Sequence, residues 1–123
     1  MLTIPGATAT AAAVASSVSI SAAALATTQW AISLTVTNLT CASGTPRARI
    51  TVEDSVDAFT TPLTIGCFNL EGPILASAPV TVSIPRELCP SLRAGVTSAV
   101  LRFNLIALEG TSPTITYAGQ LLP

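Results

Sequence analysis

Apolar and polar residues alternate along most of this chain, and a repeat of two residues is typical of β-strands with one buried face. The clearest run is residues 30–36 (WAISLTV), where large apolar side chains alternate with Ala, Ser and Thr. Similar alternation predicts strands within 14–20, 48–52, 63–68, 80–84, 98–108 and 114–121. Seven or eight short strands predict an all-β fold, an antiparallel β-sandwich of which the jelly roll is one variant.

Glycine and proline clusters separate these runs and predict tight connections, as at residues 43–46, 71–73 and 110–113. The Ala-rich start has high helix propensity. Its alternation of Thr, Ser and Val nevertheless favours a first strand or an extended arm over residues 1–28. Residues 29–123 then form the sandwich, within a single domain overall.

The composition indicates a surface with few charges and many small hydroxyl side chains. Charged residues make up 9% of the chain, against about 25% in typical proteins, and neither Lys nor His occurs. Thr, Ser and Ala together supply about 40% of the residues, and hydroxyl groups can be buried without the large desolvation cost of an ion. With a net charge of −1 there is little repulsion between copies. We therefore expect a surface that subunit contacts cover; the alternative is a neutral, Thr-rich secreted β-domain.

The strand predicted at 98–108 is apolar on both faces, which is uncommon in a small antiparallel sandwich. Its second face is expected to meet another subunit, or else to be covered by the N-terminal segment. The predicted subunit or capsid contacts are Leu2, Ile4, Pro5, Arg47, Arg49, Val100, Ile106 and Leu108, with Arg86 and Arg93 as second candidates.

No Lys or Arg precedes Arg47, so we expect no secretory signal, and no uninterrupted apolar run is long enough for a membrane span. Three widely spaced cysteines, Cys41, Cys67 and Cys89, form no C-x-x-C pair, and no His is present to complete a zinc site. We expect reduced thiols in a protein that folds in a cytosol, with Cys67 packed in a strand; a disulfide is the alternative.

The residue types exclude most catalytic chemistry. Without His or Lys the chain cannot build a Ser-His or Ser-Lys nucleophile, and it has no phosphate-binding glycine loop. No spacing selects a carboxylate pair of the glycosidase kind, and the single Trp30 is expected to be a core anchor. We expect no enzyme, no catalytic residue and no cofactor.

Three of the six acidic residues lie in RARITVEDSVDAFTT, residues 47–61. Oxygen ligands from Glu53, Asp54 and Asp57 would suit a calcium ion, but the EF-hand pattern is absent and three carboxylates cannot fill six or more positions. The prediction is therefore a structural turn without a metal, in which Glu53 ends a strand, Asp54 and Asp57 form side-chain-to-backbone turn bonds, and Ser55 assists. Arg47 and Arg49 share a face with Glu53 and are expected to offset its charge.

Nucleic acid is not an expected partner, because five scattered arginines form no basic stripe and the net charge is negative. Arg86, Arg93 and Arg102 are instead predicted to pair with Glu87, Glu109 or a carboxylate of a neighbouring subunit.

Three segments carry a family resemblance: WAISLTVTNLT (30–40), ARITVEDSVDAFT (48–60) and VTVSIPRELCPSLRAGVTSAVLRFNLIALEGTSPTITYAG (80–119). Together they resemble small β-sandwich virion structural proteins of tailed bacteriophages, the capsid decoration or cement proteins, in which a similar turn and strand follow a long β-strand. The resemblance covers about two-thirds of the chain and leaves out the first 28 residues. Its motifs describe strands and turns, so it transfers no catalytic residue.

The resemblance implies a virion protein made in the host bacterial cytoplasm and seated on the capsid surface. Its implied partners are the major capsid protein and copies of itself, with a trimer as the expected oligomer. A tail or connector component fits the same segments. A sugar- or receptor-binding β-sandwich is the alternative from another class, and it predicts a stable monomer with an open, aromatic-lined cleft.

Overall fold

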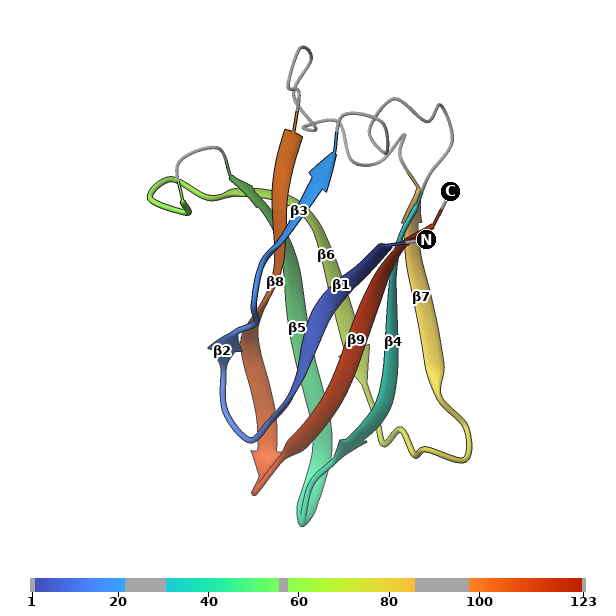
Figure 1. Ribbon diagram of the computed structural model, residues 1–123. Coiled ribbons are helices and arrows are strands. Elements are labelled where there is room, and N and C mark those ends of the chain that lie inside the picture. The colour runs from blue at the N-terminus through green and yellow to red at the C-terminus, as the bar shows by residue number, and fades with distance from the viewer. Residues whose placement is uncertain (1, 22–30, 56–57, 86–97, 123) are drawn as a thin grey trace.

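The computed structural model describes residues 2–21, 31–55, 58–85 and 98–122, which form nine strands in two antiparallel sheets (Figure 1). The strands are β1 (Leu2–Ala9), β2 (Ala13–Val14), β3 (Val18–Ser21), β4 (Ala31–Thr40), β5 (Ser43–Ser55), β6 (Leu63–Glu71), β7 (Val80–Pro85), β8 (Ser98–Thr111) and β9 (Thr114–Leu122). Sheet A has the order β1-β9-β4-β7, and sheet B has the order β2-β8-β5-β6, with β3 also paired to β8. The predicted all-β sandwich is confirmed.

The N-terminal segment belongs to both sheets. Residues Leu2–Ala9 pair with β9 in sheet A, so this part of the chain is a strand and not an arm. Strands β2 and β3 then pair with successive parts of β8, as two halves of one interrupted edge strand. Counted in this way, each sheet has four strands, the number that a double Greek-key jelly roll would need; that variant of the sandwich stays a prediction.

The core lies between the sheets and is built from the inward-facing side chains of both. The larger side chains that are fully buried are Ile4, Ile20, Ile32, Leu34, Val36, Leu39, Ile50, Val52, Leu101, Phe103, Leu105 and Ile115. Phe103 meets Phe68 and Tyr117 edge-on, with ring centroids 6.5 and 5.9 Å apart, a favoured aromatic geometry. Gly119 makes room for this ring, because a Cβ atom there would collide with Phe103 and with the carbonyl oxygen of Ser33.

A β-bulge in β8 changes which side chains face the core. The register with β5 shifts between Arg49 and Ile50, which leaves Ile106 as an extra residue on β8. Ile106 stays on the outer face and is 43% exposed, whereas Leu108 turns inward and packs against the core. The strict alternation that placed Ile106 and Leu108 on one face is corrected here.

A second bulge corrects the prediction for Cys67. The pairing of β5 with β6 shifts register between Val52 and Glu53, so that Ile65 becomes an extra residue on β6. Beyond this point the inward positions are Phe68 and Leu70, and Cys67 is exposed instead of packed. Trp30, Arg86, Cys89 and Arg93 lie outside the described residues, and so do the predictions made for them.

The burial of Tyr117 should make the stability of the fold depend on pH. Burial raises the pKa of its phenol above the ordinary value, because the charged phenolate loses its water. The unfolded chain releases this proton near pH 10 and the folded chain only at higher pH, so the free energy of unfolding should fall as the pH rises above about 10. Tyr117 is the single tyrosine, so ultraviolet absorbance of the phenolate reports it alone. Tyr117→Phe should abolish the titration and flatten the alkaline loss of stability; a phenol that titrates near pH 10 in the folded protein would contradict this.

Candidate functional site

Charged side chains gather on one face of the molecule. The chain has eleven charged residues, seven of which lie in the described ranges. Six of these seven point away from the core on the outer face of sheet B: Arg47, Arg49, Glu53, Glu71, Arg102 and Glu109. The outward direction follows from the alternation, since Ala48, Ile50 and Val52 on β5 are buried in the core.

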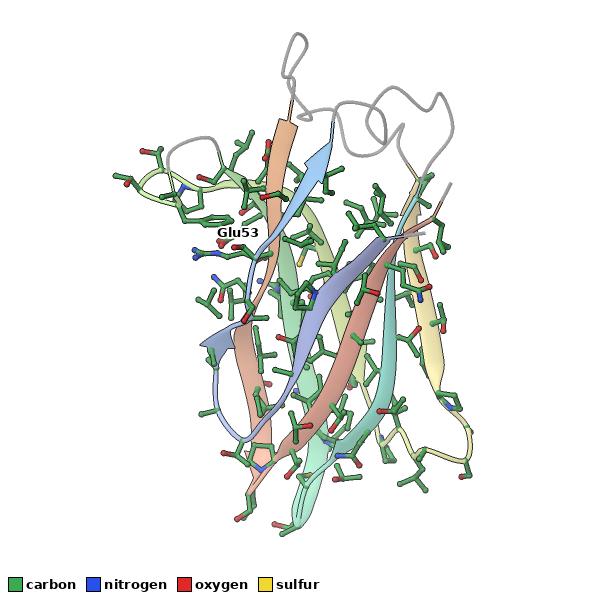
Figure 2. The ribbon with its side chains drawn as sticks, viewed as in Figure 1. Glu53 is labelled. Carbon is green, nitrogen blue, oxygen red and sulfur yellow. The ribbon has the colours of Figure 1, made fainter. Side chains whose placement is uncertain are left out.

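The upper part of this face, near the end of β5, holds a buried ion pair (Figure 2). Arg102 Nε donates to Glu53 Oε1 at 2.8 Å, and Asn104 Nδ2 donates to Glu53 Oε2 at 3.3 Å. Glu53 is only 7% exposed. The Arg102 guanidinium also lies 3.9 Å from the centre of the Phe59 ring, a cation–π contact that shields the pair from water.

The segment after β5 folds back over this ion pair. The Phe59 backbone N–H donates to Ser55 Oγ at 2.7 Å, which confirms the turn-forming role predicted for Ser55. Ala58 and Phe59 both adopt left-handed backbone angles, with φ of 55° and 61°. This conformation is uncommon for residues with a Cβ atom, and the Ser55 bond and the Arg102 contact help to hold it.

Two predictions about the acidic stretch are corrected by these contacts. Arg102, on β8, offsets the charge of Glu53, whereas Arg47 and Arg49 lie farther along β5 and bond other partners. Arg102 was expected to pair with a different carboxylate. Asp57 lies outside the described residues, and within the described ranges no three His, Cys, Asp or Glu side chains come close enough to hold a metal ion.

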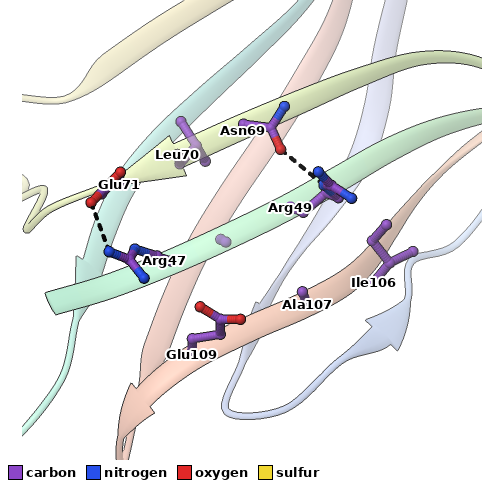
Figure 3. Close-up of a pocket in the computed structure, with 9 residues that line it drawn as sticks. Arg47, Arg49, Asn69, Leu70, Glu71, Ile106, Ala107 and Glu109 are labelled. Carbon is purple, nitrogen blue, oxygen red and sulfur yellow. Dashed lines mark hydrogen bonds and ion pairs between the residues drawn. The ribbon is translucent and has the colours of Figure 1, made fainter. Parts of the chain in front are cut away.

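The lower part of the charged face forms an open groove of about 620 Å³ between β6, β5 and β8 (Figure 3). We call it the arginine groove; its main side chains are Arg47, Arg49, Asn69, Glu71, Ile106 and Glu109. Arg47 Nη2 lies 3.0 Å from Glu71 Oε1, and both side chains are more than half exposed. Arg49 Nε donates to Asn69 Oδ1 at 2.9 Å. Within the described residues, neither Arg49 nor Glu109 has an ion-pair partner.

The predicted contact residues separate into two groups in the structure. Arg47, Arg49 and Ile106 come together in the arginine groove, although only the two arginines are close in sequence. Val100 is half-buried and pairs with Ser55, at the other end of the same face.

The other predicted contacts are wholly or partly buried within the subunit, and for the half-buried ones a role in subunit contacts stays a prediction. Ile4 is fully buried in the core, so its side chain is not available to a neighbouring subunit, and the prediction is corrected. Leu2 and Leu108 are half-buried and pack against the same core. Pro5 is half-buried in β1.

Sheet A has an outer face of the opposite kind. Strands β1, β4, β7 and β9 contain no Asp, Glu, Lys or Arg. We call this surface the hydroxyl face; its outward side chains include Thr3, Thr8, Thr35, Thr81, Ser83, Thr116, Ala118 and Gln120. Cross-strand threonine pairs join the strands, with Oγ1 atoms 3.1 Å apart for Thr8 and Thr116 and 3.0 Å apart for Thr35 and Thr81.

The hydroxyl face was not predicted as a unit, because its strands come from four separate parts of the sequence. The signal that could have found it is the lack of any charge in all four of those segments. The predicted contact residues in sheet A were confined to Leu2, Ile4 and Pro5, at its N-terminal edge strand.

Comparison with known proteins found no relative: no family model, curated protein or solved structure matches the chain. Within the described residues, no helix has the length and hydropathy needed to cross a bilayer.

The buried ion pair should contribute more to stability than the exposed one. Removing Arg102 leaves the Glu53 carboxylate buried without its cation, and breaking such a pair typically costs about 3 kcal/mol or more. We expect Arg102→Ala to lower the free energy of unfolding by about that amount in urea denaturation. The matched control Arg47→Ala breaks a pair that is more than half exposed on both sides, and should cost less than about 1 kcal/mol. Equal losses in the two variants would contradict this ranking.

Proposed function

We propose that this chain is a non-enzymatic structural protein of a tailed-phage virion, which decorates or cements the capsid through subunit contacts. The observation that carries the proposal is the hydroxyl face, a four-stranded surface without a charged residue. Threonine and serine hydroxyls can exchange water for a partner's polar groups at a far lower cost than ions can. Such a face suits permanent burial against a protein lattice.

The energetics of attachment follow from burial and symmetry. Apolar burial contributes about 25 cal/mol per Å² before the costs of ordering, and an ordinary protein contact buries about 1,600 Å² in total. On a capsid, the same contact is repeated at every equivalent site, so a modest contact is sufficient to coat a particle. The partner that this proposal names is the major capsid protein, and the phage assignment rests on the sequence resemblance. A β-sandwich is compatible with it but hosts many other functions.

The sugar- or receptor-binding alternative finds less support on the charged face. Sugar-binding sites of sandwiches usually offer exposed aromatic rings, and no aromatic residue lines the arginine groove. Of the aromatic residues in the described ranges, Phe68, Phe103 and Tyr117 are in the core and Phe59 covers Arg102. A tail or connector component would use the same uncharged face, and the location of the protein on particles distinguishes it.

A charge placed on the hydroxyl face should prevent attachment. Ala118 is exposed on β9, one of the two inner strands of sheet A, so Ala118→Glu adds a carboxylate to the face without entering the core. Burying that charge against a partner costs several kcal/mol, so we expect the variant to fold but to be absent from purified particles. Ala42→Glu, which adds the same charge in the exposed β4–β5 connection, is the matched control and should attach normally.

Because no ions take part, attachment of the unmodified protein should change little between about 0.05 M and about 1 M NaCl. Sedimentation of particles, with quantification of this chain relative to the shell protein, measures the attachment of the variants and its dependence on salt. Absence of the chain from particles, a variable stoichiometry, or release by salt would each count against the proposal.

A further inference from the structure

The arginine groove carries a set of charges that matches a copy of itself. Its four ionisable side chains are two arginines and two glutamates, so their formal charges cancel. Arg47 and Glu71 already form an ion pair, whereas Arg49 on β5 and Glu109 on the neighbouring strand β8 have no ion pair in the described part of the chain (Figure 3). We propose that this groove binds a second copy of the chain across a two-fold axis, with Arg49 of each copy paired to Glu109 of the other.

Two-fold symmetry doubles the number of ion pairs that this contact forms. In such a contact the same patch is used by both subunits, so an Arg49–Glu109 pair formed once is necessarily formed twice. A guanidinium and a carboxylate can join in a bidentate arrangement, which fixes orientation as well as adding energy. The Nε atom of Arg49 is held by Asn69, so the side chain is positioned while its terminal nitrogens can serve a partner.

An apolar centre lies beside these charges. Ile106, at the β8 bulge, is 43% exposed, and Val14 on β2 is 50% exposed. Val14 is paired with Asn104, two residues from Ile106, so the two side chains are diagonal neighbours on the outer face of sheet B. Exposed apolar side chains surrounded by charged residues are the usual anatomy of a protein contact, with a dry centre and a polar rim.

The same features argue against other occupants of the groove. A nucleic acid or a free anion needs an excess of positive charge, and here each arginine is matched by a glutamate. A sugar is usually held against an aromatic ring, and the lining has none. A second copy supplies both signs of charge and the apolar side chains in the required arrangement.

The size of the face sets the expected affinity. The outer face of sheet B, four strands wide, presents roughly 600 Å² in projection. This is somewhat below the roughly 800 Å² that each partner buries in a standard interface. We therefore expect a reversible dimer with a dissociation constant in the micromolar range, weakened by salt because charge pairs at its rim are screened. Pairing through sheet B leaves the hydroxyl face of each copy free, so this inference deepens the proposed function and rests on it only for the expectation of subunit contacts.

Sedimentation equilibrium of the purified full chain tests the pairing. Arg49→Glu and Glu109→Arg each place like charges opposite one another twice, and each should raise the dissociation constant at least about tenfold. The double variant with both changes restores opposite charges and should recover the dimer. Circular dichroism shows whether each variant folds, and Ala118→Glu, on the opposite face of the sandwich, is the control that should leave the dimer unchanged.

A chain that stays monomeric at high concentration would overturn the inference, as would a trimer, single variants without effect, or a double variant that fails to recover. The two proposals fail separately. Loss of pairing in Arg49→Glu with normal binding to particles leaves the capsid proposal intact. A dimer that never associates with particles refutes the capsid proposal alone.

Discussion

The antiparallel pairing of β5 with β8 is the constraint on which the rest of sheet B depends. Both strands are internal to the sheet, and they pair along most of their length, from Ser43 opposite Thr111 to Ser55 opposite Val100. Their inward side chains form the centre of the core around Phe103. Their outward side chains include five of the six charged residues on the outer face of the sheet. One pairing therefore organises both the stability and the electrostatics of this half of the molecule.

The distribution of charge gives the two outer faces different physical properties. A chain with so few ions could have scattered them evenly to keep the whole surface hydrated. Instead, the charges of the described residues concentrate on sheet B, and the four strands of sheet A present hydroxyls, Ala and Gln. An uncharged face loses little on dehydration, whereas a face of balanced charges gains orientation from its partner. Two surfaces of this kind are what the two proposed contacts would use, one to a lattice and one to a second copy.

Sheet B itself divides into a sealed part and an open part. Near the end of β5, Glu53 and Arg102 are covered by Phe59, so their charges are satisfied within the subunit. Toward the other end, Ile106 is exposed at the β8 bulge, and the arginine groove stays open beside it. The bulge is thus a local irregularity with one main effect: it turns Leu108 into the core, while Ile106 before it remains at the surface.

The sequence by itself determined the all-β sandwich, most strand positions and the turns at Gly72 and Gly110, because alternation and glycine placement are local properties of the chain. It also indicated that Arg47, Arg49 and Ile106 would be at the surface. Only the tertiary structure decided which side chains meet. The Glu53–Arg102 pair joins strands 49 residues apart in sequence, and single-residue bulges reverse the facing of Cys67 and Leu108. Those outcomes depend on the register between strands, which is set by the packing of the whole core and leaves no mark in the alternation of one strand.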